Sequence, residues 1–180
     1  NKLHNIDQEN SDQIKILHAC SIKQMGARRY IYHSSSEYVQ SLLNICKKLV
    51  ILRKKIKLII RIRPVKNEIN INYLKEELKD FLDFIEFSNK ESFLDELSSV
   101  DCLIALSSTT LEQALYNNLP ALSIGETGYD HLSNYKGKYI PKTHPKYKKL
   151  SNIESALGKK FIYFSKIKRD KVLEFNSIIS

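Results

Sequence analysis

The segment between residues 102 and 124 constrains the fold more than any other part of the chain. An apolar run, Cys102 to Leu106, has the length and composition of a strand buried on both faces. Four hydroxyl residues, Ser107 to Thr110, follow it, and a helix with apolar residues on one face comes next. Pro120 ends that helix, and a second apolar run, Ala121 to Ile124, begins directly after it. This order of strand, hydroxyl turn, helix and strand predicts part of a parallel α/β sheet.

The hydroxyl turn is the strongest candidate for a binding site. In a parallel α/β sheet, ligands bind at the turn after a strand's carboxyl end. Free amides at the N-terminus of the next helix favour an anion there. We therefore expect Ser107, Ser108, Thr109 and Thr110 to hold a phosphate or diphosphate. Helix capping is the alternative, because one of these hydroxyls would be enough for a cap.

Strands alternate with helices along the rest of the chain. Besides the two runs above, strands are predicted at Ile14–Cys20, Ile56–Ile62, Phe84–Phe87 and Phe161–Phe164. Helices are predicted at about 35–53, after a cap at Asn72, at 89–98 with Phe93, Leu94 and Leu97 inward, at 151–157, and at 168–179. The alternation predicts an α/β fold, a Rossmann-like parallel sheet of about six strands with helices on both faces.

The length of 180 residues suits one domain or one half of a larger enzyme. We expect a polar tail or linker at 1–13, a Rossmann-like domain at 14–167, and a C-terminal helix at 168–180. No apolar run is long enough to span a bilayer, and the first residues lack the pattern of a signal peptide. Three widely spaced cysteines, Cys20, Cys46 and Cys102, indicate reduced, buried thiols of a cytoplasmic protein.

The net charge of +9 raises the question of an anionic partner. Basic residues cluster at 47–57, 136–149 and 159–171, without the interleaved aromatics of an RNA-binding sheet. Nucleic acid is therefore disfavoured. Peripheral contact with an anionic membrane, a phosphorylated substrate and a merely solvated lysine-rich surface all stay open.

Four motifs together resemble the C-terminal nucleotide-sugar-binding domain of GT-B glycosyltransferases of the bacterial surface or capsular polysaccharide type. The strand ending in Ile60-Arg61-Ile62-Arg63-Pro64 is similar to the family's hydrophobic strand with a basic residue before proline. Residues 93–101 resemble the helix that leads to a "D-x-h-I" strand, and residues 107–115 resemble the "S-S-T-x-x-E-A-h" turn and helix. Asn118-Leu119-Pro120-Ala121-Leu122 resembles "G-h-P-h-h", with Asn in place of Gly. The resemblance covers about residues 14 to 125.

The resemblance implies a role for several residues. The four hydroxyls would hold the donor diphosphate, and Glu112 would accept hydrogen bonds from ribose or sugar hydroxyls. Arg63 would contact a phosphate, and His18, near the end of the first strand, would bind donor or acceptor. The ordinary alternatives are a charge that favours the helix for Glu112, a surface salt bridge for Arg63 and simple packing for His18.

The expected function is metal-independent transfer of a sugar from a nucleotide diphosphate, with no cofactor. No strand-end Asp-x-Asp and no His/Cys cluster suggests a metal site. A GT-B enzyme needs an N-terminal acceptor domain as well, so the domain alone should be inactive. We expect a cytoplasmic location, with peripheral attachment to the inner membrane as an option. The alternatives are a nucleotide-sugar epimerase or hydrolase on the same scaffold, and a non-enzymatic basic module that binds a phosphorylated partner or nucleic acid.

Overall fold

Five strands form one sheet in the order β3-β2-β1-β4-β5. The computed structural model describes residues 12–20, 35–62, 70–106, 109–124 and 132–164. The strands are β1 (Ile14–Cys20), β2 (Ile56–Ile62), β3 (Ile85–Phe87), β4 (Cys102–Ala105) and β5 (Ala121–Ser123). Every neighbouring pair is parallel. The predicted Rossmann-like α/β fold with a parallel sheet is confirmed.

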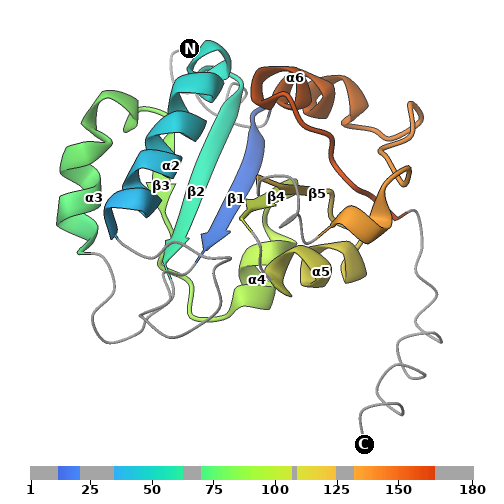
Figure 1. Cartoon of the computed structure of the whole chain (residues 1–180), viewed down its shortest axis with the longest axis horizontal. Helices are drawn as coiled ribbons and strands as arrows, with labels where there is room; N and C mark the ends of the chain where they lie inside the picture. The colour runs from blue at the N-terminus through green and yellow to red at the C-terminus, as the bar shows by residue number, and fades with distance from the viewer. Residues whose placement is uncertain (1–11, 21–34, 63–69, 107–108, 125–131, 165–180) are drawn as a thin grey trace, which may run out of the picture.

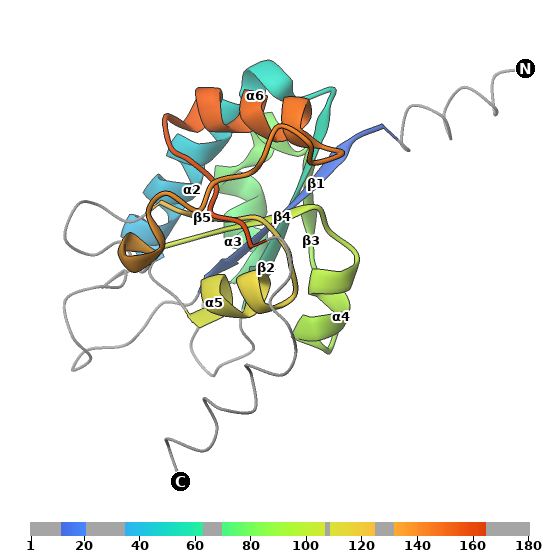
Figure 2. The same ribbon diagram turned by 90° about the vertical axis from the view of Figure 1, so that its right-hand side faces the viewer.

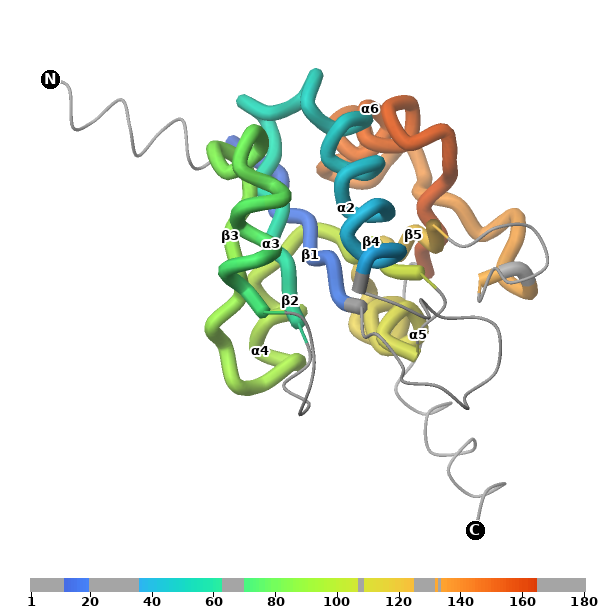
Figure 3. Tube along the Cα trace, turned by 60° about the vertical axis from the view of Figure 1, so that its left-hand side comes forward, coloured from blue at the N-terminus to red at the C-terminus, as the bar shows by residue number. Residues whose placement is uncertain are grey.

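Helices cover both faces of this sheet. They are α2 (Ser35–Leu49), α3 (Ile71–Glu77), α4 (Phe93–Ser98), α5 (Thr109–Tyr116) and α6 (Tyr147–Leu157), with short 3-10 turns η1 (Val50–Leu52), η2 (Lys79–Phe81) and η3 (Ser133–Tyr135). Figure 2 shows α2 and α6 on one side of the sheet and α4 and α5 on the other. In Figure 3, α2 lies between α3 and α6.

The alternation of side chains along β1 produces two cores. Ile14 and Ile16 point into the core beneath α2, α3 and α6, whereas Leu17 and Ala19 point into the core beneath α4 and α5. All four are buried, which agrees with the near-continuous apolar composition of a strand covered on both faces. Central strands of this kind hold the two helical layers together through the hydrophobic effect.

Several predicted elements differ from the observed ones. Instead of a sixth strand, Phe161–Phe164 contributes an isolated antiparallel bridge from Ile162 to Ala121. Asn70 rather than Asn72 caps α3, since the Asn70 side chain accepts a hydrogen bond from Asn72 N at 2.8 Å. Leu94 was predicted to point inward but is 59% exposed. The predicted helix at 151–157 begins earlier, at Tyr147. The predicted terminal helix lies outside the described residues.

The segment after α6 is attached to the domain by a buried carboxylate. Gly158 ends α6 at φ 69°, the left-handed geometry that glycine adopts most easily. The chain then turns back, and the Glu154 carboxylate accepts hydrogen bonds from Phe161 N at 2.9 Å and Lys160 Nζ at 2.9 Å. Phe161 is fully buried, so its N–H has no access to water.

We therefore expect Glu154→Ala to destabilise the protein by about 2 kcal/mol, because the buried N–H of Phe161 would lose its acceptor. Urea unfolding followed by circular dichroism measures this change. The exposed Glu77 provides a control, and Glu77→Ala should change the unfolding free energy by less than about 0.5 kcal/mol. Equal stability of the two variants would contradict this role of Glu154.

Candidate functional site

The candidate site lies at the carboxyl edge of the sheet, where β1 and β4 are neighbours. Chain connections leave this point in opposite directions, since β2 and β3 lie on one side of β1, and β5 lies beyond β4. Such a reversal of strand order opens a crevice outside the carboxyl ends of the strands. In Figure 1, the arrowheads of β1 and β2 point toward the lower edge, where α4 and α5 lie.

The predicted hydroxyl turn connects β4 to α5 at this edge. Because β4 ends at Ala105 and α5 begins at Thr109, only three residues separate the buried strand from the helix. The first amides of α5 are therefore held close to the strand end. Thr109 is exposed and Thr110 is partly exposed, so this end of the helix is accessible to a ligand. Ser107 and Ser108 lie outside the described residues.

Glu112 lies on α5 close to the turn η3. The pKa of the Tyr135 phenol is raised, first by burial and then by the negative charge of Glu112. Since Tyr116 also contributes to this shift, Glu112 and Tyr116 lie near Tyr135. Glu112 is partly exposed, so its carboxylate is accessible from solvent at the first turn of α5.

His18 lies on the α2 side of β1 and is fully buried. Its ring stacks against the ring of Tyr38 in the first turns of α2, with centroids 6.0 Å apart and planes at 22°. Its Nδ1 lies 3.0 Å from Ile104 O. A carbonyl oxygen can only accept, so Nδ1 carries the proton and Nε2 carries a lone pair. Nε2 is buried and has no hydrogen-bond partner among the described residues.

Burial lowers the pKa of His18 to about 4, although the hydrogen bond to Ile104 acts in the opposite direction. The imidazole is therefore neutral at pH 7. In the described structure His18 and the start of α5 lie on opposite faces of the sheet, because His18 points toward α2 and α5 packs against the other core. A shared ligand would have to reach both across the strand ends.

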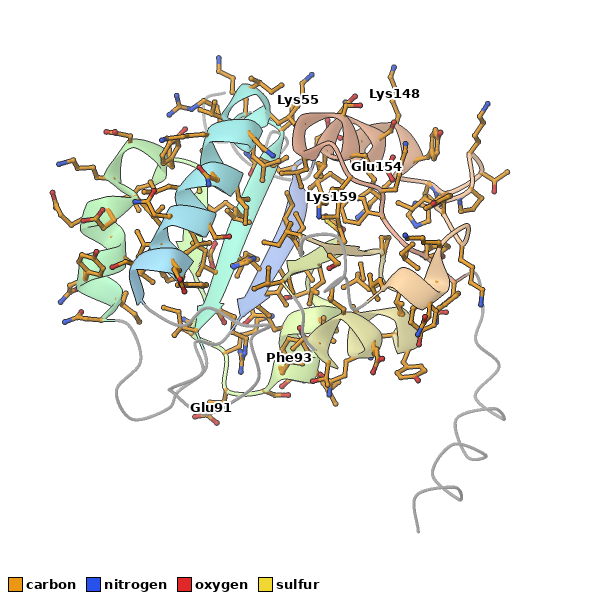
Figure 4. All side chains as sticks on the ribbon, in the orientation of Figure 1. Lys55, Glu91, Phe93, Lys148, Glu154 and Lys159 are labelled. Atoms are coloured by element: carbon orange, nitrogen blue, oxygen red, sulfur yellow. The ribbon has the colours of Figure 1, made fainter. Side chains whose placement is uncertain are left out.

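Arg61 is held in a cluster that the sequence analysis did not anticipate. Its guanidinium donates from Nη1 to Glu96 Oε2 at 3.0 Å and Lys90 O at 2.7 Å, and from Nη2 to Glu91 O at 2.9 Å. Ser88 Oγ also donates to the Glu96 carboxylate. The side chains of Arg61 and Glu96 are only 14% and 3% exposed. Arg61 thus fixes the loop after β3 at the carboxyl edge, and Figure 4 shows Glu91 and Phe93 there.

This cluster positions the loop, because Arg61 uses three of its five N–H donors within the protein. Arg63, the residue predicted to contact a phosphate, lies outside the described residues. Sequence signals for the cluster exist: Arg61 follows the apolar run 58–60 in β2, and Glu96 lies next to the inward Leu97 on a short helix. Without the distances, these signals do not identify the pair as partners.

The thiols of Cys46 and Cys102 are buried and mostly protonated at neutral pH. Burial raises the pKa of Cys46 to about 12 and raises that of Cys102 well above its usual range. Both are free thiols. Within the described ranges, no group of three or more His, Cys, Asp or Glu side chains could hold a metal ion. The same ranges contain no helix long and apolar enough to cross a bilayer.

Comparison with known proteins defines the fold class no further. No protein-family model matches the chain, and no curated protein matches it. Among solved structures, the chain is similar to the Holliday junction-resolving enzyme GEN1 in complex with product DNA and Mg²⁺, with a TM-score of 0.35 and 15% identity. The match covers 67% of this chain and 31% of that chain. Similarity at this level carries no argument about function.

We expect replacement of Arg61 by alanine to destabilise the protein by about 3 kcal/mol, because Glu96 would remain buried without its partner. Arg53→Ala is the matched control. Arg53 pairs with Asp83 at 2.7 Å, but both side chains are nearly half exposed, and such a pair contributes less than about 1 kcal/mol. Thermal and urea unfolding of the two variants measure the difference. Equal losses of unfolding free energy in the two variants would show that the buried pair contributes no more than the exposed one.

Because burial lowers the pKa of His18, we expect the protein to lose stability in acid. Its folded pKa of about 4 lies below the usual value of 6.5, so the unfolded chain binds a proton that the folded protein excludes. Stability should therefore fall as the pH drops below 6.5, and the loss should be complete below pH 4. Between pH 7 and pH 4.5, we expect the unfolding free energy of the wild type to fall by about 2 kcal/mol more than that of His18→Leu. An NMR titration of the His18 ring with a midpoint near 6.5 would contradict this assignment.

Proposed function

We propose that this chain is the donor-binding domain of a GT-B type glycosyltransferase that uses a nucleotide-diphosphate sugar in bacterial surface polysaccharide synthesis. The observation that carries the proposal is the reversal of strand order between β1 and β4, with only three residues between the end of β4 and the N-terminus of α5. A diphosphate fits this position, because amides and hydroxyls that meet there would stabilise its negative charge.

The chemistry of transfer fits the same elements. Departure of a nucleotide diphosphate develops negative charge on the leaving phosphate, and preorganised amide dipoles stabilise such charge without a metal. In the proposal, Ser107, Ser108, Thr109 and Thr110 contact the diphosphate, and Glu112 accepts hydrogen bonds from ribose or sugar hydroxyls. Arg63 would add a cationic contact. The acceptor and the general base would come from an N-terminal domain.

The described carboxyl edge supports a transferase better than an epimerase or hydrolase on the same scaffold. Those enzymes need several carboxylates and a histidine around the sugar. Glu96, one carboxylate near this edge, is already paired with Arg61, and His18 is buried beneath α2. The motif resemblance between residues 14 and 125 further supports the transferase.

A screen of thermal stability against UDP, GDP, CMP, CDP and ADP tests the proposal. We expect one nucleoside diphosphate to raise the unfolding temperature by several degrees at saturating concentration, since ligand bound only to the folded state stabilises it. Ser108→Ala and Glu112→Ala should reduce the shift. Thr143→Ala and Glu77→Ala replace exposed residues elsewhere and should keep the wild-type shift.

The activity of the domain provides a second readout. Because the proposed general base lies in another domain, these 180 residues alone should transfer no sugar. Sugar transfer by the isolated chain would overturn that division of roles. A shift that is equal in wild type, Ser108→Ala and Glu112→Ala would overturn the proposed site.

A further inference from the structure

The amino edge of the sheet, opposite the candidate site, carries a dense group of lysines. Residues 47–57 contain six basic side chains and no acidic one. They span the last turn of α2, the turn η1 and the start of β2. A second basic group, at residues 146–149, begins α6. Both groups are visible in the sequence, but their partner is not.

The fold places the two groups together. Leu52 and Lys55 from the turn before β2 line a small surface depression together with Lys149 and Asn152 from α6. Figure 4 shows Lys55 and Lys148 at the same upper edge of the molecule, whereas Glu91 and Phe93 lie at the lower edge. Segments about 90 residues apart in sequence thus form one basic surface.

Some cations of this surface already have carboxylate partners. Arg53 pairs with Asp83, Lys146 with Asp101, and Lys149 with Asp12. Five exposed lysines have no carboxylate partner among the described residues, namely Lys47, Lys48, Lys54, Lys55 and Lys148. Lys47 and Lys48 also favour the C-terminus of α2 through its dipole. That explanation does not extend to the other three, which lie beyond α2.

An apolar side chain projects from the same surface. Ile51 is 77% exposed, more than any other large hydrophobic residue of the described structure. It lies in η1, which continues α2 through a helical Leu49, so Ile51 follows Lys47 and Lys48 by about one turn. Exposure of a branched aliphatic side chain to this extent leaves apolar surface in contact with water, which is unfavourable. We define the lysine face as Ile51 with the five lysines above.

We infer that the lysine face docks on an anionic lipid bilayer. Lysines near a membrane attract anionic headgroups, and a single aliphatic residue among them can enter the boundary between headgroups and acyl chains. A nucleic acid fits less well, because single strands need aromatic stacking platforms, and residues 47–57 contain no aromatic side chain. The one arginine of that segment is paired with Asp83.

Docking by this face would leave the carboxyl edge pointing away from the bilayer, since the two edges lie at opposite ends of the strands (Figure 1). One aliphatic residue and a basic surface give weak, reversible attachment rather than a permanent anchor. The inference goes beyond the proposed function and does not depend on it, because no residue of the lysine face belongs to the candidate site.

Sedimentation with lipid vesicles tests the inference on the full chain. We expect the protein to sediment with vesicles of phosphatidylcholine mixed with phosphatidylglycerol, but not with phosphatidylcholine alone, and added salt should release it. Lys54→Gln/Lys55→Gln should weaken partitioning by roughly fivefold per lysine, or about 25-fold for the pair. Ile51→Ser, which changes no charge, should weaken it by about tenfold.

Matched controls distinguish binding through the lysine face from a general effect of lost charge or lost apolar surface. Lys75→Gln/Lys136→Gln removes the same charge at exposed positions elsewhere, and Leu94→Ser removes an exposed leucine at the opposite edge. Both controls should bind vesicles like wild type. All variants replace exposed residues, and unfolding temperatures close to wild type would verify that they fold.

Three results would overturn the inference. The first is that the protein fails to sediment with the anionic vesicles. The second is that the controls lose as much binding as the lysine-face variants. The third is that an oligonucleotide binds through the lysine face while vesicles do not. The nucleotide-induced thermal shift is measured on the same variants. A retained shift with lost vesicle binding, or the reverse, identifies which of the two proposals fails.

Discussion

The parallel pairing of β1 with both β2 and β4 is the constraint on which the other features depend. β1 pairs with β2 along seven residues and with β4 along three, so it forms the centre of the sheet. Its alternating side chains supply both cores, and the strand order reverses beside it, the position at which open α/β sheets bind ligands. At the same seam, the His18 ring donates to Ile104 O of β4, which adds a side-chain hydrogen bond to the backbone ladder. Because this imidazole is neutral and fully buried, the stability of the pairing between β1 and β4 should depend on pH.

The elements that local patterns determine could be predicted from sequence. The apolar runs at β1, β2, β4 and β5 were predicted within about a residue, because a strand buried on both faces leaves a continuous apolar signal. The helices α2 and α5 follow from their apolar spacing. Errors occurred where neighbouring residues offer similar signals. Asn70 and Asn72 are both good caps, and only the backbone geometry selects Asn70. Phe161–Phe164 has the composition of a strand, but only Ile162 pairs with β5.

The parts of the site that depend on distant residues could not be predicted. Arg61 and Glu96 are separated by more than thirty residues, and nothing in the local pattern shows that they form a buried pair. Either charge would be costly to bury without its partner, so the pairing offsets that cost. The pair also holds the loop from Ser88 to Glu91 in place. In the same way, the orientation of His18 toward Tyr38 follows from strand parity and register, which a composition argument does not provide. The ends of β4 and α5, by contrast, could be predicted, because they depend on two adjacent elements alone.

The two ends of the strands therefore have different physical characters. At the carboxyl edge, the buried Arg61 guanidinium pairs with Glu96, and the start of α5 offers amides and hydroxyls. Amide dipoles select an anion by geometry over a short range. At the amino edge, five lysines lack carboxylate partners among the described residues. Their electrostatic field extends over about a Debye length and does not depend on a particular geometry of the ligand. Short-range, oriented donors suit recognition of one small ligand, whereas a diffuse positive field suits an extended anionic surface. Because the same sheet separates the two edges, a change in either one should leave the electrostatics of the other nearly unaltered.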